Sequence, residues 1–317
     1  MSLVICLARA AARRAPSICL TSVVVVRLVL GWASAGAAAT SSCPDAPQRF
    51  ETFSLFAPAL ERAKQILVYL PPGYDCAAAR RYPVFYFNDG HDLFDWNPST
   101  AGLEPAVEAD IAAREAWYGS WRLEDQLGRA IADGRLPALI VVGIASDDGM
   151  RSRDLAPAPW AGSKEGRGAQ YGDFIAQTVV GAVDRRFRTI PNRRCRGIGG
   201  ASLGGISALQ IGLAHPDRFG LVLALSPVLG DRALAVYLAA AWPVADRAHL
   251  SDFLIDFDDD AKGSADRAWF ASVVRTATAG GGQAALIQTP AGRHAIASWA
   301  ERAVPALQQL LGAPCFE

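Results

Sequence analysis

The sequence lacks several features that would point to particular classes of protein. Its 31 lysine and arginine residues are balanced by 31 aspartate and glutamate residues, so no excess of positive charge favours a nucleic-acid partner. It has no low-complexity tail and no repeat of solenoid period, which excludes a repeat architecture. No two cysteines form a C-x-x-C pair, so a zinc site is not expected. What remains is a chain of 317 residues, 51% apolar, that can bury a large core.

Acidic residues are missing from the first forty positions, which differ from the rest of the chain. This stretch combines several arginines with an apolar segment, 28–39, that reads LVLGWASAGAAA and ends in small residues. A cationic start, an apolar middle and an A-x-A-like end are typical of a secretory signal peptide. We therefore predict a signal peptide over residues 1–39, with cleavage after Ala35 or Ala39.

A membrane anchor over residues 17–39 is the alternative interpretation of the same stretch. It would place Arg27 inside the apolar span, at a cost of about 2.5–3.5 kcal/mol near a helix centre. We therefore expect an exported chain, secreted or periplasmic, without a stable membrane anchor. Residues 40–317 have a length that suits one large domain or two small ones, and we expect a single domain there.

Six cysteines are present, and removal of the predicted leader would leave four of them. An even number of cysteines in an exported protein is typical of disulfides, so we expect at least one. The sequence does not distinguish the three possible pairings of Cys43, Cys76, Cys195 and Cys315.

Short apolar runs alternate with segments of helical periodicity along the predicted domain. Runs that are apolar on both faces are typical of buried parallel strands covered by helices on each side. We therefore predict an α/β fold with a mostly parallel central sheet and helices on both faces. The expected strands are 64–70, 83–88, 138–145, 195–201, 220–226, 252–257 and 284–289, and the expected helices are 104–117, 123–132, 171–187, 203–214, 265–278 and 297–311.

A single serine, Ser202, stands among glycines where a predicted strand meets a predicted helix. The stretch Gly200-Ala201-Ser202-Leu203-Gly204 has the spacing Gly-x-Ser-x-Gly. On a sharp strand-to-helix turn this spacing forms a nucleophile elbow, which exposes the serine hydroxyl and lets strand and helix pass closely. The alternative is a glycine-rich turn capped by a serine. The apolar context on both sides favours the nucleophile.

A serine nucleophile needs a base, and the chain has only four histidines. In this type of fold the acid and then the histidine follow the nucleophile in the chain. His91 precedes Ser202, His215 lies too close to it, and His249 comes before the late strand 252–257. His294 follows the last predicted strand, so chain order selects it as the base.

The acid of the triad is expected just after the strand 252–257, in the stretch DFDDDAKGSAD. Asp256 is expected to belong to the strand and Asp266 to start the next helix, which leaves Asp258, Asp259 and Asp260, and we favour Asp260. The same run could be a solvated acidic loop. A calcium site is discounted because an EF-hand loop starting at Asp256 would lack its required glycine and glutamate. We expect no metal and no cofactor.

An oxyanion hole requires two backbone N–H groups. One is expected at Leu203, directly after the nucleophile, and the other in the loop after an early strand. That loop reads NDGHDLFD, residues 88–95, and its tightest point is Gly90-His91. We therefore assign the second donor to the backbone of His91.

Together these stretches resemble the esterase family of α/β-hydrolases that includes enterochelin esterases, feruloyl esterases, S-formylglutathione hydrolases and mycolyltransferases. The resemblance spans about residues 60–312. It implies that Ser202 is the nucleophile, His294 the base, and Leu203 and His91 the oxyanion donors. It is carried by VYLPPGY (68–74), YPVFYFNDGHDLFD (82–95), ALIVVGI (138–144), VDRRFRT (183–189), GIGGASLGGISALQIGLAHPDRFG (197–220), ALSP (224–227) and GRHAIASW (292–299).

The chain departs from the family pattern D-x-G-x-x-[D/E] after the late strand. Asp258 stands in the place of the glycine and Ala261 in the place of the acid, and shortening by one residue would make Asp260 the acid. The family's fold also implies that the long segment 146–170, which is expected to be a loop, approaches the site. Its candidate substrate contacts are Arg151, Arg153 and Trp160.

The resulting hypothesis is a serine esterase, a carboxylic ester hydrolase that acts through an acyl-enzyme on a small-molecule ester. An acyltransferase that passes the acyl group to a sugar or lipid hydroxyl would use the same residues. A non-catalytic binding protein on a hydrolase scaffold is the third possibility, and the disturbed acid position is its only support. The sequence leaves the ester and the oligomeric state open.

Overall fold

The computed structural model describes residues 47–76, 78–95, 119–146, 149–156, 166–227, 252–257, 284–289 and 292–311, with Cys315 and single positions between 268 and 278. The chain divides into two compact units, Met1–Thr40 and Ser41–Glu317. The first unit, with the predicted signal peptide and its cleavage sites, lies outside the described residues. In the described ranges, no helix has both the length and the apolar character needed to span a bilayer.

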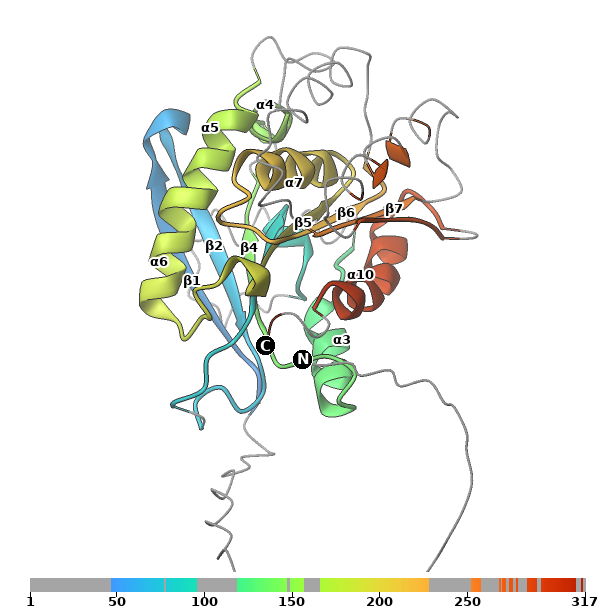
Figure 1. Ribbon diagram of the computed structural model, residues 1–317. Helices are drawn as coiled ribbons and strands as arrows, with labels where there is room; N and C mark the ends of the chain where they lie inside the picture. Colours follow the sequence, from blue (N-terminus) through green and yellow to red (C-terminus); the bar gives the residue numbers. More distant parts are fainter. Residues whose placement is uncertain are drawn as a thin grey trace, which may run out of the picture. The chain divides into compact units, whose positions relative to one another are not determined.

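The second unit is built on one eight-stranded sheet with the strand order β1-β2-β4-β3-β5-β6-β7-β8 (Figure 1). The strands β1, β2 and β4 pair antiparallel, and all pairs from β4 to β8 are parallel. The predicted α/β-hydrolase fold with a mostly parallel sheet is therefore confirmed. The strands are β1 (Arg49–Ala57), β2 (Arg62–Leu70), β3 (Val84–Asn88), β4 (Ile140–Ile144), β5 (Arg196–Ala201), β6 (Leu221–Leu225), β7 (Asp252–Phe257) and β8 (Ala284–Gln288).

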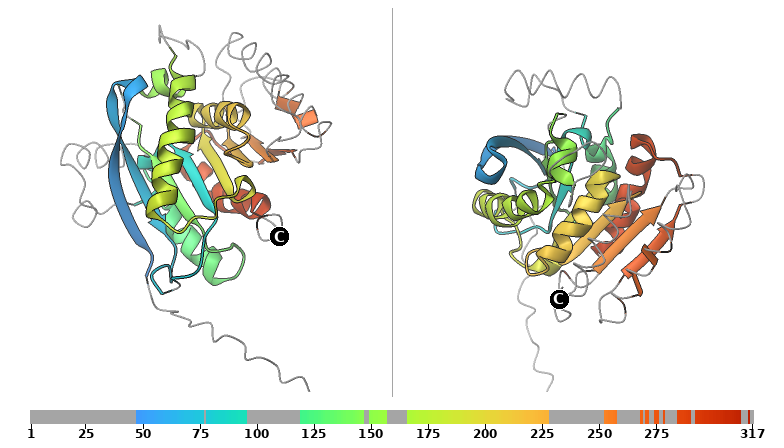
Figure 2. Two further views of the ribbon diagram at one scale, coloured as in Figure 1. Left: turned by 60° about the vertical axis from the view of Figure 1, so that its left-hand side comes forward. Right: turned by 90° about the horizontal axis from the view of Figure 1, so that it is seen from above.

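Helices cover both faces of this sheet, and α7 and α10 lie on opposite faces (Figure 2). The helix α5 continues through a π-helical segment, η3, into α6. The helices are α3 (Leu123–Ala132), α4 (Arg151–Leu155), α5 (Gly168–Asp173), η3 (Phe174–Val179), α6 (Val180–Arg186), α7 (Leu203–Ala214) and α10 (Ile296–Leu310), with short 3-10 turns at η1 (Pro58–Leu60), η2 (Gly90–Asp92) and η4 (Arg193–Cys195).

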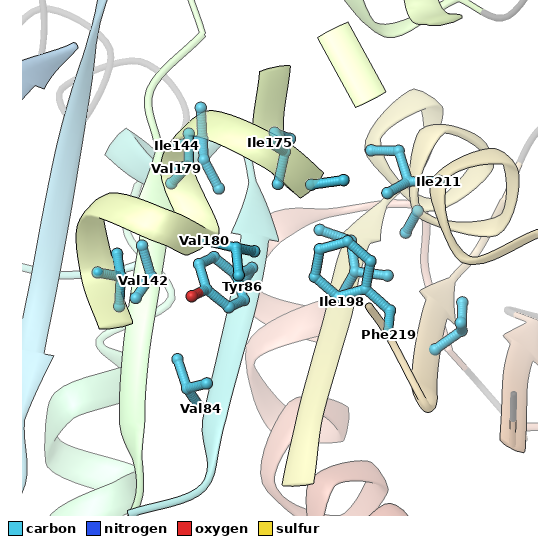
Figure 3. Close-up of a cluster of buried hydrophobic side chains, with 14 of the residues drawn as sticks. Val84, Tyr86, Val142, Ile144, Ile175, Val179, Val180, Ile198, Ile211 and Phe219 are labelled. Atoms are coloured by element: carbon cyan, nitrogen blue, oxygen red, sulfur yellow. The ribbon is translucent and has the colours of Figure 1, made fainter. Parts of the chain in front are cut away.

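The two faces of the sheet form two separate cores because side chains alternate along each strand. On β3, Val84 and Tyr86 face the core shared with α5, α6 and α7. Phe85 and Phe87 face the core shared with α3 and α10. Figure 3 shows part of the first core, where Tyr86 lies beside Val180 and other apolar side chains. Strands buried on both faces read as continuous apolar runs, which is why the sequence revealed them.

Three elements differ from the sequence-based expectation. The strand β1 was not expected, because its half-exposed residues show no clean alternation of apolar and polar positions. The segment 146–170 is not only loop, since it contains α4 and the start of α5. The predicted helix 104–117 lies outside the described residues, and of 265–278 only single helical positions are described.

Cys195 and Cys315 form a disulfide, so the prediction of at least one disulfide is confirmed. Cys76 is also disulfide-bonded.

Candidate active site

Ser202 occupies the sharp turn between β5 and α7, in a backbone conformation that few residues adopt. Its φ is 56° and its ψ is −122°. The Ser202 N–H donates to the carbonyl of Leu225 at 2.9 Å, which ties the turn to the neighbouring strand β6. Such strain persists only where the surrounding structure holds it, and it exposes the serine at the carboxyl end of the sheet.

The glycines on either side of Ser202 permit this turn. A Cβ on Gly200 would lie 2.5 Å from the carbonyl oxygen of Gly204, so strand and helix pass too closely for any side chain. A Cβ on Gly204 would lie 2.8 Å from Oδ2 of Asp89. The spacing Gly-x-Ser-x-Gly therefore reflects steric requirements of this elbow.

The structure brings His294 to Ser202. Nε2 of His294 lies 2.9 Å from Oγ of Ser202, although 92 residues separate the two in the chain. The ring of Trp299 packs edge-on against the imidazole, with ring centroids 5.0 Å apart and an interplanar angle of 88°. His215, by contrast, ends α7 far along the helix from Ser202 and pairs with Asp173 at 3.2 Å. Burial lowers the pKa of His215.

A buried polar network, which the sequence did not reveal, holds Trp299. Its Nε1 donates to Oγ of Ser226 at 3.0 Å, and Arg302 donates to the same oxygen at 2.9 Å. Arg302 also lies 3.3 Å from the carboxylate of Asp256, which accepts a hydrogen bond from Thr289 at 2.8 Å. The ends of β6 and β7 and the helix α10 are thus joined behind the histidine.

Asp256 belongs to β7, as predicted. The acid candidates Asp258, Asp259 and Asp260 follow it directly and lie outside the described residues. They remain predictions that rest on chain order and on the resemblance.

The two predicted oxyanion donors lie on two segments that the structure packs together. Leu203 is the first residue of α7, where helix N–H groups have no partner within the helix. His91 lies in η2, at the end of β3. Gly90 packs directly on β4, since a Cβ there would lie 2.3 Å from the carbonyl carbon of Gly143. The side chain of Asn88 donates to the carbonyl of Gly204 at 2.8 Å, which joins the η2 turn to the elbow.

The imidazole of His91 is buried and braces the η2 turn from within. Nδ1 accepts a hydrogen bond from the backbone N–H of Ser146 at 3.1 Å. In the neutral ring this places the proton on Nε2, which lies 3.2 Å from the carboxylate of Asp92. The side chain thus fixes the loop that carries the backbone N–H of His91, the predicted oxyanion donor.

Arg151, one of the expected substrate contacts, is engaged in an internal ion pair. Its Nε and Nη2 donate to the two oxygens of Asp89 at 2.7 and 2.8 Å. Although burial opposes ionisation, this pair lowers the pKa of Asp89 to about 2. Arg153 lies two residues further along α4, half-buried, and Trp160 lies outside the described residues.

The arrangement at the carboxyl end of the sheet suits nucleophilic acyl transfer. It provides Ser202, the predicted nucleophile, which is half-buried, a histidine within hydrogen-bond distance of it, and a helix N-terminus that favours negative charge. Among the described side chains, no group of three or more His, Cys, Asp or Glu is placed to hold a metal ion.

Comparisons with known proteins bear on the family and the fold. A family model described as "Putative esterase" matches residues 57–302. YbbA of Bacillus subtilis, named as an uncharacterized protein, is 24% identical over 169 residues, which cover 51% of this chain and just over half, 56%, of that protein. Among solved structures, a ferulic acid esterase is similar with a TM-score of 0.58 and 20% identity, over 84% of this chain and 98% of that one. An IroE-like serine hydrolase from Shewanella oneidensis has a TM-score of 0.62 and 17% identity, over 83% of this chain and 80% of that one.

Proposed function

Since the chain belongs to this esterase family of α/β-hydrolases, we propose that Ser202 and His294 carry out its ester hydrolysis through an acyl-enzyme. The observation that carries the proposal is the 2.9 Å contact between Oγ of Ser202 and Nε2 of His294 at the strained elbow. A hydroxyl on an ordinary turn would need neither the strain nor the histidine.

The reaction proceeds in two steps. Oγ of Ser202 attacks the ester carbonyl carbon, and its proton passes to Nε2 of His294. The carbonyl oxygen becomes an oxyanion and accepts hydrogen bonds from the N–H groups of Leu203 and His91. Collapse of this intermediate expels the alcohol, which takes the proton from His294. Water then attacks the acyl-enzyme by the same route, and the acid and free serine are released.

The aspartate that orients His294 is proposed to be Asp260, with Asp258 and Asp259 as alternatives. A carboxylate that accepts the Nδ1–H of the histidine keeps Nε2 free to take the serine proton. Three single variants, Asp258→Asn, Asp259→Asn and Asp260→Asn, identify the acid. Substitution of the aspartate that orients His294 should lower kcat by up to about 10⁴-fold. The other two variants should keep a kcat close to that of the parent.

Hydrolysis of p-nitrophenyl acetate, butyrate and octanoate tests the function, beside methyl ferulate because a structural relative is named a ferulic acid esterase. The parent should turn over at least one of these esters with a burst, and Ser202→Ala should abolish both burst and turnover. A fluorophosphonate should label the parent only at Ser202. No turnover and no labelling of the parent would favour a binding protein on this scaffold. If an alcohol is supplied in the assay, formation of its ester with the acyl group of the substrate would favour the acyltransferase.

Export to an oxidising compartment is part of the proposal. The Cys195–Cys315 disulfide supports it, because disulfides persist mainly outside the reducing cytosol. Mass spectrometry of the protein from secreted, periplasmic and membrane fractions tests the prediction. An N-terminus at Gly36 or Thr40 in a soluble fraction is expected, whereas an uncleaved chain in the membrane fraction would favour the anchor.

A further inference from the structure

Arg151 reaches back 62 positions in the chain to Asp89, at the start of the η2 turn. The contact is bidentate, which fixes both the distance and the plane of the two groups. Asp89 itself has a left-handed backbone, with φ of 56° and ψ of 46°. A non-glycine residue in this conformation needs support from its surroundings. Arg151 supplies such a support at Asp89, two residues before the predicted oxyanion donor His91.

The carboxylate of Asp89 lies against the start of α7, the helix whose first residue is the predicted oxyanion donor Leu203. Its Oδ2 is only 2.8 Å from the place that a Cβ of Gly204 would take, so it rests on the first turn of α7 beside Leu203. The side chain of Asp89 is 10% exposed. An unpaired negative charge in this position would oppose the negative charge that forms on the substrate oxygen. The guanidinium of Arg151 balances that charge.

The helix α4, which carries Arg151, is itself held in place by ion pairs with β2. Asp154, on the same helix, pairs with Arg62 and, at 2.7 Å, with Lys64, both on β2. Lys64 and Asp154 are buried, with 3% and 2% of their side chains exposed. Gly168 donates to the carbonyl of Ala156 at 3.0 Å and closes the far end of the helix. The short helix is therefore fixed to β2, the second strand of the sheet, and Arg151 bridges from it to the active site.

We propose that Arg151 is a positioning residue for the oxyanion hole, which holds the η2 turn in place through Asp89 and neutralises that carboxylate beside Leu203. This inference rests on the proposed function. It replaces the expected direct contact between Arg151 and the substrate with an indirect role in the chemical step.

Steady-state kinetics of Arg151→Ala and Arg151→Lys with p-nitrophenyl butyrate test the inference. Loss of the ion pair should lower kcat about 10–100-fold with little change in KM, because a donor misplaced by about 1 Å fails mainly in the transition state. Lysine keeps the charge but loses the two-pronged contact, so Arg151→Lys should recover part of kcat. Arg167→Ala is the matched control. Its guanidinium anchors the same segment to the carbonyl of Ala59, at 3.1 Å, and its loss should leave kcat unchanged.

A trifluoromethyl ketone separates positioning from a general loss of structure. Ser202 adds to its carbonyl, and the resulting oxyanion occupies the hole. Its inhibition constant should rise in Arg151→Ala by about the same factor as kcat falls. Adding Asp89→Asn to Arg151→Ala removes the unbalanced carboxylate and should restore kcat several-fold. Arg151→Ala and the double variant are compared with the parent at a temperature at which circular dichroism shows that all of them are folded. If Arg151→Ala does not fold, the same measurements are made on Arg151→Lys.

Two results would overturn the inference. An increase in KM that varies between esters, with kcat and ketone binding unchanged, would make Arg151 a substrate contact. An unchanged kcat with a lower melting temperature would make the ion pair purely structural. Neither result contradicts the proposed function. The proposed function is wrong only if the parent neither hydrolyses esters nor reacts at Ser202.

Discussion

Asn88 is the residue that connects the sheet to the elbow, and Tyr171 keeps it in place. The amide of Asn88 donates to the carbonyl of Gly204 at 2.8 Å and accepts the hydroxyl of Tyr171 at 3.0 Å. Both residues are buried. Burial, with the nearby charges of Asp89 and Asp154, raises the pKa of Tyr171 well above its ordinary value. The tyrosine therefore stays protonated and donates across the working pH range.

We predict that Tyr171→Phe lowers the free energy of unfolding by roughly 1–3 kcal/mol, because the buried Asn88 oxygen loses its donor. Urea unfolding monitored by fluorescence measures this. Tyr69→Phe is the matched control. Among the described residues no group forms a hydrogen bond with the buried Tyr69 hydroxyl, so its removal should cost little. Equal losses in the two variants would contradict the role assigned to Tyr171.

The Asp89–Arg151 pair makes stability depend on acidity. The pKa of Asp89 is lowered from 3.8 to about 2 in the fold, so the folded state binds the proton less readily than the unfolded chain. The pair therefore stabilises fully above about pH 4, by about 2 kcal/mol, and this contribution is lost as the pH falls towards 2.

We predict that the stability difference between the parent and Asp89→Asn shrinks by about 2 kcal/mol between pH 5 and pH 2. Urea unfolding at pH 5, 3.5 and 2 measures it for both proteins. A difference that stays constant over this range would show that Asp89 titrates normally in the fold, and the ion pair would then carry no net stability.

At the scale of elements, α10 supports His294, the proposed base, through Trp299. It starts two residues after His294 and carries Trp299 and Arg302, whose contacts with Ser226 join it to β6. The Arg302–Asp256 pair is buried, with 7% and 6% of the side chains exposed. Removing one member leaves a buried charge, which costs more than the pair contributes.

We predict that Arg302→Ala lowers the free energy of unfolding by roughly 3–5 kcal/mol and also lowers kcat, since Trp299 and His294 lose part of their support. Urea unfolding and p-nitrophenyl butyrate hydrolysis measure the two effects. Glu301→Ala, one position away on the exposed face of α10, should change stability by no more than about 0.5 kcal/mol. If Arg302→Ala and Glu301→Ala had the same free energy of unfolding, the Arg302–Asp256 pair would contribute nothing to stability.

At the scale of the whole molecule, the features that sequence reveals are those with a local cause. The strands β3, β4 and β6 are buried on both faces and read as unbroken apolar runs. The elbow needs glycine at fixed spacing, and chain order left His294 as the base with few competitors. These local rules gave the fold and the pairing of Ser202 with His294.

Side-chain contacts between residues far apart in the sequence could not be predicted from such local patterns. Arg151 was a candidate substrate contact because it lies in a long segment, and only the fold shows its pairing with Asp89. The positions of Trp299 and Arg302 behind His294 likewise depend on how α10 docks on the sheet. The strand β1 was not predicted because its partly exposed residues do not alternate strictly between apolar and polar side chains.

The disulfide joins two residues that are far apart in the sequence, since Cys195 and Cys315 are separated by 120 positions. Cys195 directly precedes β5, which leads to Ser202, and Cys315 follows α10, which supports His294. A cross-link that closes so long a loop restricts the unfolded chain, and its loss typically costs about 2–5 kcal/mol.

We predict that the double variant Cys195→Ser, Cys315→Ser unfolds at a markedly lower temperature than the parent but keeps a similar kcat at 25 °C, because the disulfide lies outside the elbow and the base. Differential scanning calorimetry and ester hydrolysis measure the two quantities. Cys76→Ser, which breaks the other disulfide, is the control for cross-linking elsewhere in the domain. A parallel loss of kcat and stability in the double variant alone would mean that the cross-link also sets the distance between Ser202 and His294. An unchanged melting temperature would mean that packing of β5 and α10 already holds the two elements together without it.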